Sequence, residues 1–139
     1  MKKFILIISG VLVLSVVTFV GYESLKFRSC MKKVKEAGSM SSEEMVDFSF
    51  KVAEAYRALP AVGSRMHEFC HAILQLEIRG IRDKEMLLDF ATHTTISSKA
   101  AHVPIEKMAD LYASNYIKLQ LTSSQTDELV LEMIKLSGK

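Results

Sequence analysis

The sequence predicts an all-α protein in which an N-terminal transmembrane helix precedes a small bundle of about five helices. Three observations lead to this prediction. Residues 4–22 carry no charged side chain. Beyond residue 40, apolar residues recur every three or four positions, which is the spacing of an amphipathic helix. No stretch alternates apolar and polar residues as a half-buried strand would.

The N-terminal segment, residues 1–25, is expected to anchor the chain in a membrane. A helix over the nineteen residues 4–22 would rise about 1.5 Å per residue and so span roughly the hydrocarbon core of a bilayer. A cleaved signal peptide is the alternative, because Met1-Lys2-Lys3 followed by an apolar run fits that pattern too. Residues 17–22 (VTFVGY) lack the small-residue pattern needed for cleavage, which favours an uncleaved anchor.

Charge divides the chain into a basic flank and an acidic remainder. Up to residue 35 there are seven Lys or Arg and one Glu; eleven basic and fifteen acidic residues follow, which gives the remainder a net charge of −4. We therefore expect residues 26–40 to be a basic juxtamembrane linker and residues 41–139 to be the helical domain. A domain without a basic face lacks the footprint of a nucleic-acid-binding protein, so no nucleic-acid partner is expected.

The short N-terminal tail favours export of the domain. Lys2 and Lys3 favour a tail that stays inside, whereas the basic residues within 26–35 oppose that orientation. A three-residue tail usually stays inside in bacteria, so the expected location is the bacterial inner membrane, with a single span and a periplasmic domain. In a cytoplasmic domain the same basic residues would instead contact anionic lipid headgroups.

Capping and breaking residues define the first two helices of the domain. Ser41-Ser42-Glu43-Glu44 combines hydroxyl caps with first-turn acids and predicts a helix start. Pro60 and Gly63 end this helix. A second helix is predicted from about Ser64 to Arg79, with Gly80 as its C-cap.

The remaining helices follow from the same signals. A third helix begins at Asp83 and is expected to weaken over residues 92–98, where β-branched and hydroxyl residues lower helix propensity. Pro104 opens a fourth helix, as a first-turn proline does. Residues 122–126 read as a polar break, after which residues 129–134 form a final short helix.

A weak internal repeat relates these helices. Residues 43–49 (EEMVDFS) align with residues 85–91 (EMLLDFA) at a shift of 42, and residues 127–130 (DELV) follow at the same interval. Helix pairs of this size are the units of right-handed α-solenoids. Two stacked hairpins plus a closing helix, or a compact five-helix bundle, would both fit this pattern.

Residues 67–71 read His-Glu-Phe-Cys-His, which resembles the zincin signature H-E-x-x-H. The resemblance implies His67 and His71 as zinc ligands and Glu68 as the general base. It covers five residues of 139, and Leu74 stands where a metzincin helix has glycine. Third-ligand candidates are Glu77, Glu85, Asp89, His93, His102, Glu106 and Asp110.

The repeat favours a coincidental match. At a shift of 42, the positions of His67, Glu68 and His71 fall on Ala109, Asp110 and Ala113, so packing alone explains this helix. We therefore expect no catalytic, cofactor-binding or metal-binding residue, with zinc held by His67 and His71 as the alternative.

Two cysteines are present, Cys30 and Cys70. In an exported domain they could form one disulfide between the juxtamembrane segment and the helix around residue 70. Cys70 could instead be a buried free thiol, or Cys30 could pair between two chains.

The sequence therefore favours a non-enzymatic protein. We expect a membrane-tethered helical domain that binds another protein, or a second copy of itself, as an inhibitor, immunity protein or assembly factor of the bacterial envelope; the choice of these roles rests on analogy. Its contact with lipid is through residues 4–22. The alternative is a small membrane-anchored zinc-dependent hydrolase that uses the HEFCH motif.

Overall fold

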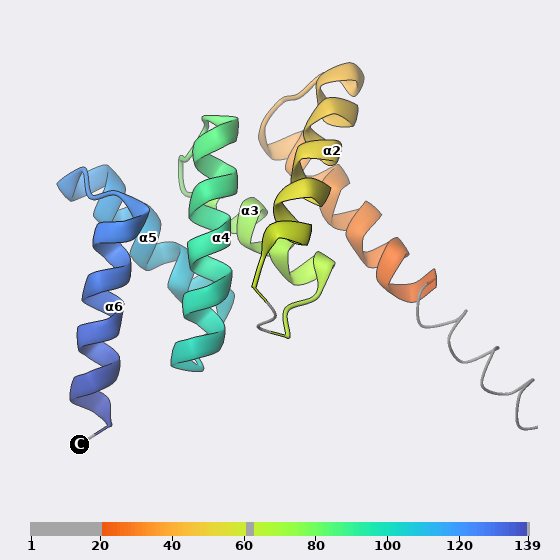
Figure 1. The fold of residues 1–139 in the computed structure, drawn as a ribbon. Helices are drawn as coiled ribbons and strands as arrows, with labels where there is room; N and C mark the ends of the chain where they lie inside the picture. The colour runs from red at the N-terminus through yellow and green to blue at the C-terminus, as the bar shows by residue number, and fades with distance from the viewer. Residues whose placement is uncertain (1–20, 61–62, 139) are drawn as a thin grey trace, which may run out of the picture.

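The computed structural model describes residues 21–60 and 63–138. In this part of the chain all regular structure is helical, with six helices and no strand, which confirms the all-α prediction. The first helix covers residues 21–37. It is followed by α2 (Ser42–Ala58), α3 (Met66–Ile78), α4 (Lys84–Ala101), α5 (Ile105–Leu119) and α6 (Ser123–Ser137), as Figure 1 shows.

The predicted membrane anchor lies almost wholly outside the described residues, which begin at Gly21. Within the described ranges, none of the helices is both long enough and apolar enough to cross a bilayer.

Residues 26–40, expected as a linker, belong to the folded domain. They are helical up to residue 37, and Met31 and Val34 are buried in the core. Phe27, Met31 and Val34 are spaced by four and three residues, so they form one apolar stripe on a helix. The dense Lys and Arg residues between them occupy the opposite, exposed face and mask this pattern in the sequence.

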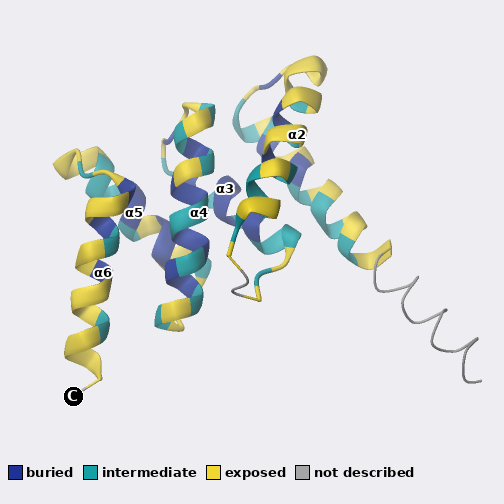
Figure 2. Cartoon of the chain, viewed as in Figure 1, coloured by how far each residue is buried: buried dark blue, intermediate teal, exposed yellow. Residues whose placement is uncertain are grey.

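The helices form two layers of three. In Figure 1, α2, α4 and α6 lie side by side in one layer, and the first helix, α3 and α5 lie behind them. The contacts follow this order: α4 packs against both α2 and α6, and α3 packs against α5. The dark blue, buried positions in Figure 2 are most frequent in α3 and α4, the central helices of the two layers. Among the largest buried side chains there are Phe48, Phe69, Ile73, Leu87 and Tyr112.

Two elements differ from their predicted bounds. Helix α4 is continuous through residues 92–98, because Thr94, Thr95, Ser97 and Ser98 are buried against neighbouring helices and this packing outweighs their low propensity. Helix α6 begins at Ser123, within the expected polar break. The polar residues are its cap: Thr122 accepts from the backbone N–H of Gln125, whose side chain accepts from the backbone N–H of Thr122.

The internal repeat changes its period along the chain. Helix α4 begins 42 residues after α2, at Lys84 against Ser42, whereas α6 begins 39 residues after α4. Helix α5 also begins 39 residues after α3. This offset is shorter than 42 because the loop between α2 and α3 is longer than the loop between α4 and α5, so α3 begins later in its helix pair than α5 does. With the first helix included, the described chain consists of three successive helix pairs.

Candidate functional site

The H-E-x-x-H residues occupy the first two turns of α3. The helix begins after Arg65, whose backbone N–H donates to Glu68 Oε2 at 2.9 Å. Glu68 therefore closes the N-terminus of its own helix, as an acid at the third helical position commonly does. Phe69 and Cys70, the two residues inside the motif, are fully buried.

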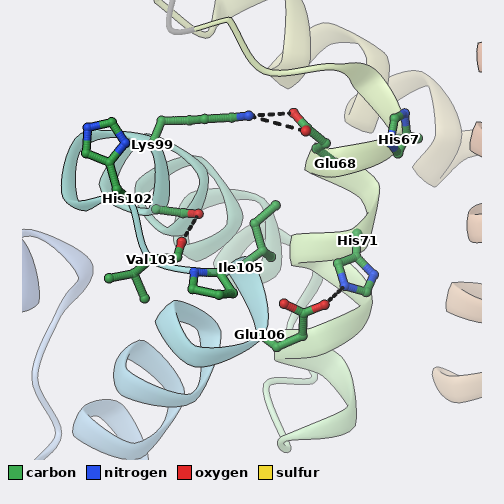
Figure 3. A pocket seen from close by; sticks show the side chains of 10 residues that line it. His67, Glu68, His71, Lys99, His102, Val103, Ile105 and Glu106 are labelled. Atoms are coloured by element: carbon green, nitrogen blue, oxygen red, sulfur yellow. Dashed lines mark hydrogen bonds and ion pairs between the residues drawn. The ribbon is translucent and has the colours of Figure 1, made fainter.

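The three polar side chains of the motif contact three different elements. His67 Nδ1 lies 2.6 Å from Glu23 Oε2 of the first helix. Glu68 accepts from Lys99 Nζ of α4, with the Oε2 contact at 3.1 Å. His71 Nε2 lies 2.7 Å from Glu106 Oε1 of α5. Figure 3 shows His71 turned toward Glu106 and Lys99 reaching across to Glu68.

Cys70 adds a covalent link in the same region. It forms a disulfide with Cys30 of the first helix, with the two Cα atoms 6.2 Å apart. The bond joins residues separated by 40 positions, and in the chain-entropy model a loop of this size stabilises the fold by about 4 kcal/mol. The disulfide and the contact between His67 and Glu23 therefore join the first helix to α3 at two positions.

Both carboxylates that face the histidines are held in their ionised form. The hydrogen bond from His67 lowers the pKa of Glu23, and the hydrogen bond from His71 lowers the pKa of Glu106. Burial acts to raise the pKa of Glu68, but the backbone N–H of Arg65 and the Lys99 ammonium outweigh it, so the pKa lies below its usual value. Glu68 is thus an ionised carboxylate whose two oxygens accept hydrogen bonds from Arg65 and Lys99.

A cavity of about 540 Å³ is lined in part by these residues (Figure 3). Its lining comes from α3, the end of α4 and the start of α5: His67, Glu68, His71, Ser98, Lys99, His102, Val103, Pro104, Ile105 and Glu106. A smaller hollow of about 240 Å³, lined in part by Lys26, Lys33 and Cys30, also borders His67 and His71. The two histidines therefore stand on the ridge between a hollow toward the first helix and one toward α5.

The described residues contain no group of three or more His, Cys, Asp or Glu side chains arranged to hold a metal ion. Of the third-ligand candidates, only His102 and Glu106 line the cavity with His67 and His71. Asp110 pairs with Arg79, His93 contacts Asp89 and Asp127, Glu85 is exposed, and Glu77 is buried in the core.

A second polar cluster joins the last three helices. His93 Nδ1 of α4 lies 2.5 Å from Asp127 Oδ2 of α6, and Tyr112 of α5 donates to the other oxygen of Asp127. Tyr112 Oη also lies 2.6 Å from Ser97 Oγ. Burial and the hydrogen bond to Asp127 raise the pKa of Tyr112, so the phenol stays protonated. This cluster could not be predicted from the sequence, because His93 and Asp127 meet only once α4 and α6 are placed side by side.

An apolar groove of about 480 Å³ opens at the C-terminal end of the helix stack, between α5 and α6 and beside the end of α4. Its lining, with Lys107 as its one charged member, is Ala101, Val103, Lys107, Met108, Leu111, Val130, Met133, Ile134 and Ser137. Around it α6 exposes Leu129, Leu131 and Leu136. The signal for this groove in the sequence is weak: α6 has more large apolar residues than one buried face can hold.

No protein-family model, curated protein or solved structure matches the sequence or fold of this chain.

Proposed function

We propose that this protein is a membrane-tethered helical-repeat domain that binds another protein at the open, C-terminal end of its helix stack. The observation that carries the proposal is the apolar groove between α5 and α6. Exposed apolar surface of this kind, next to a hollow, is typical of protein-binding sites.

The two ends of the stack differ in character. The exposed face of the first helix carries mainly polar and charged residues, among them Arg28, Ser29, Lys32, Lys33 and Glu36, together with the exposed Tyr22 and Leu25 near its start. Repeat proteins need such polar faces on their terminal units to remain soluble. The last helix instead exposes Leu131, Met133 and Leu136, with 54%, 59% and 72% of each residue accessible. An end without a polar cap is explained if a partner covers it.

The N-terminal sequence and the disulfide support the proposed location. Residues 4–22 are uncharged and long enough to span a bilayer. The Cys30–Cys70 disulfide fits an oxidising compartment such as the bacterial periplasm. A periplasmic domain at the inner membrane, acting as an inhibitor, immunity protein or assembly factor, is the role we propose, with no catalytic function.

Co-purification with matched variants tests this function. The full-length chain is extracted in mild detergent as wild type, Met133→Asp or Phe50→Asp. Met133 lines the groove, and Phe50 is a 73% exposed residue of α2, outside the groove. A partner identified by mass spectrometry should remain with wild type and Phe50→Asp, and be lost from Met133→Asp. Equal retention by all three proteins, or no specific partner, would contradict the proposal.

A zinc hydrolase is the second candidate, because His67, His71 and the ionised Glu68 line one cavity. To bind zinc, the histidines would have to leave Glu23 and Glu106. Metal content of the untagged full-length chain, beside the His67→Ala, His71→Ala double variant, decides between the two functions. One zinc per chain that the double variant loses would support the hydrolase, and its absence would remove it.

A further inference from the structure

We propose that the groove between α5 and α6 receives an amphipathic helix of the partner protein, packed as α5 packs on the preceding helix pair. This inference rests on the proposed function and adds the kind of partner segment and its mode of packing.

The first step is the correspondence between the last two helix pairs. Because α3 and α5, and also α4 and α6, begin 39 residues apart, each groove residue of α5 and α6 has an equivalent in α3 or α4. Met108 and Leu111 of α5 correspond to Phe69 and Ala72 of α3. Both of these α3 residues are fully buried.

The same shift applied to α6 gives a matching result. Val130 and Ile134 correspond to Ala91 and Thr95 of α4, which are also fully buried. The helix that packs against both α3 and α4 and follows them in the stack is α5. Tyr112 of α5 contacts Phe90 and Ser97 of α4, and the equivalents of these two residues in α6 are the exposed Leu129 and Leu136. The exposed side of α6 is thus equivalent to a surface that, one pair earlier, has the next helix packed on it.

Helix α5 shows what such an occupant looks like. Its buried residues are Met108, Ala109, Tyr112 and Ala113, of which the two alanines are small side chains beside one large ring. Tyr112 stacks edge-on against Phe90 of α4, with ring centroids 6.2 Å apart. Small residues let two helices approach closely, and the large one fills the space between them.

The groove differs from its equivalent in polarity, which defines the partner's apolar stripe. Thr94 and Thr95 of α4 are replaced by Met133 and Ile134 in α6, and Ala72 of α3 by Leu111 in α5. Tyr112 Oη forms a hydrogen bond with Ser97 of α4, whereas the position in α6 that is equivalent to Ser97 is Leu136. A helix seated here should therefore carry aliphatic residues at the positions that face α6, because a buried hydroxyl would lack its partner. Methionine at position 133 can adapt to their shape.

Charge at the rim adds a second requirement. Lys107 lines the groove, and none of the ion pairs found between described residues includes it. Its equivalent in α3 is Glu68, which pairs with Lys99. We therefore expect an acidic residue on the partner helix opposite Lys107.

A tethered helix tests the packing mode without knowledge of the partner. The probe is a second copy of residues 104–120, carrying Tyr112→Leu, joined after Lys139 by about six Gly and Ser residues; tethering supplies an effective concentration in the millimolar range. A control chain carries the same residues in an order that places no apolar stripe on one face. Both are full-length proteins in detergent micelles, with Met133→Cys as the reporter or Phe50→Cys as the reference position.

The measured quantity is the rate at which a maleimide labels the introduced thiol. The tethered amphipathic helix should slow labelling at position 133 about tenfold, as expected for a helix bound most of the time at millimolar effective concentration. The scrambled helix should not slow it, and position 50 should be unaffected by either. Equal rates with both tethered helices, or equal slowing at positions 133 and 50, would overturn the inference.

The same assay tests whether a second copy of the chain occupies the groove. Its outcome can be distinguished from that of the co-purification experiment, which tests the proposed function. If a second copy of the chain filled the groove, labelling at position 133 would slow with protein concentration in the chain without a tethered helix, and that result would also overturn the inference. The tethered helix could fail to protect position 133 while the partner is still lost from Met133→Asp in co-purification. That result would reject the helical packing mode and would still support the protein-binding function.

Discussion

Glu77 of α3 lies buried against Gly38, directly beyond the first helix, so closely that a Cβ at position 38 would overlap Glu77 Oε1. The other carboxylate oxygen, Oε2, is buried and has no hydrogen-bond partner among the described residues. The turn that connects the first helix to α2 therefore closes over an ionisable group in the core. Glycine fits this close approach, since any side chain would displace either the turn or the carboxylate.

Gly38→Ala should destabilise the protein by about 1–3 kcal/mol, which is typical of overpacking in a well-packed site. Urea denaturation of the full-length chain in detergent measures the effect. The cost should shrink when Glu77→Ala removes the carboxylate, because the two substitutions act on one contact. Equal costs in both backgrounds would show that the overlap is not the cause.

Stability should fall as pH rises through the range in which Glu77 ionises. Burial raises the pKa of Glu77 to about 7, partly opposed by Arg82. The folded state therefore favours the neutral acid: stability is highest below about pH 4.5, declines toward pH 7 and is constant above, with a total loss of roughly 3 kcal/mol. Glu77→Gln should be more stable than wild type at pH 8 by a similar amount and nearly equal at pH 4. An identical pH dependence in the two proteins would contradict this assignment.

Loss of the disulfide should weaken the attachment of the first helix. Cys30→Ala with Cys70→Ala is expected to lower the free energy of unfolding by about 4 kcal/mol, from the loop of 40 positions that the bond closes. A reductant should shift the denaturation midpoint of wild type and leave the double variant unchanged. A wild-type midpoint that does not respond to the reductant would mean that the bond does not form in the isolated protein.

Tyr112→Phe should cost about 1–3 kcal/mol, because it leaves Asp127 and Ser97 without their shared donor and acceptor in a partly buried site. Thermal or urea unfolding measures this cost. Ser97→Ala should add less in the Tyr112→Phe background than in wild type, since both belong to one hydrogen-bonded cluster. Full additivity would show that Ser97 and Tyr112 act independently.

The helices could be predicted from the sequence where local chemistry fixes their ends. Ser41 caps α2 and Asp83 caps α4 as expected, and Gly80 ends the α3 segment with a backbone φ of +104°. Pro104 immediately precedes α5. These signals depend on residues adjacent in the chain, so they are readable without the fold.

Features that depend on tertiary packing could not be predicted in the same way. The first helix was concealed by its exposed basic residues, although Met31 and Val34 belong to the core. In the HEFCH motif, the resemblance to the zincin signature implied a shared metal, whereas His67, Glu68 and His71 contact three separate helices. The shift of 42 residues also gave the wrong equivalents in α5 for these three motif residues. With the 39-residue offset between α3 and α5, the equivalents are Glu106, Lys107 and Asp110.

Photo-crosslinking in intact bacteria tests the central claim most directly. Benzoylphenylalanine would be placed at Met133 in the groove or at Phe50 on α2 of the full-length chain, and the crosslinked peptides would be identified by mass spectrometry. Binding of a partner at the open end of the stack predicts a specific crosslink to another protein from position 133 and none from position 50. Crosslinks from position 133 only to lipid or to a second copy of this chain, or the same products from both positions, would contradict it.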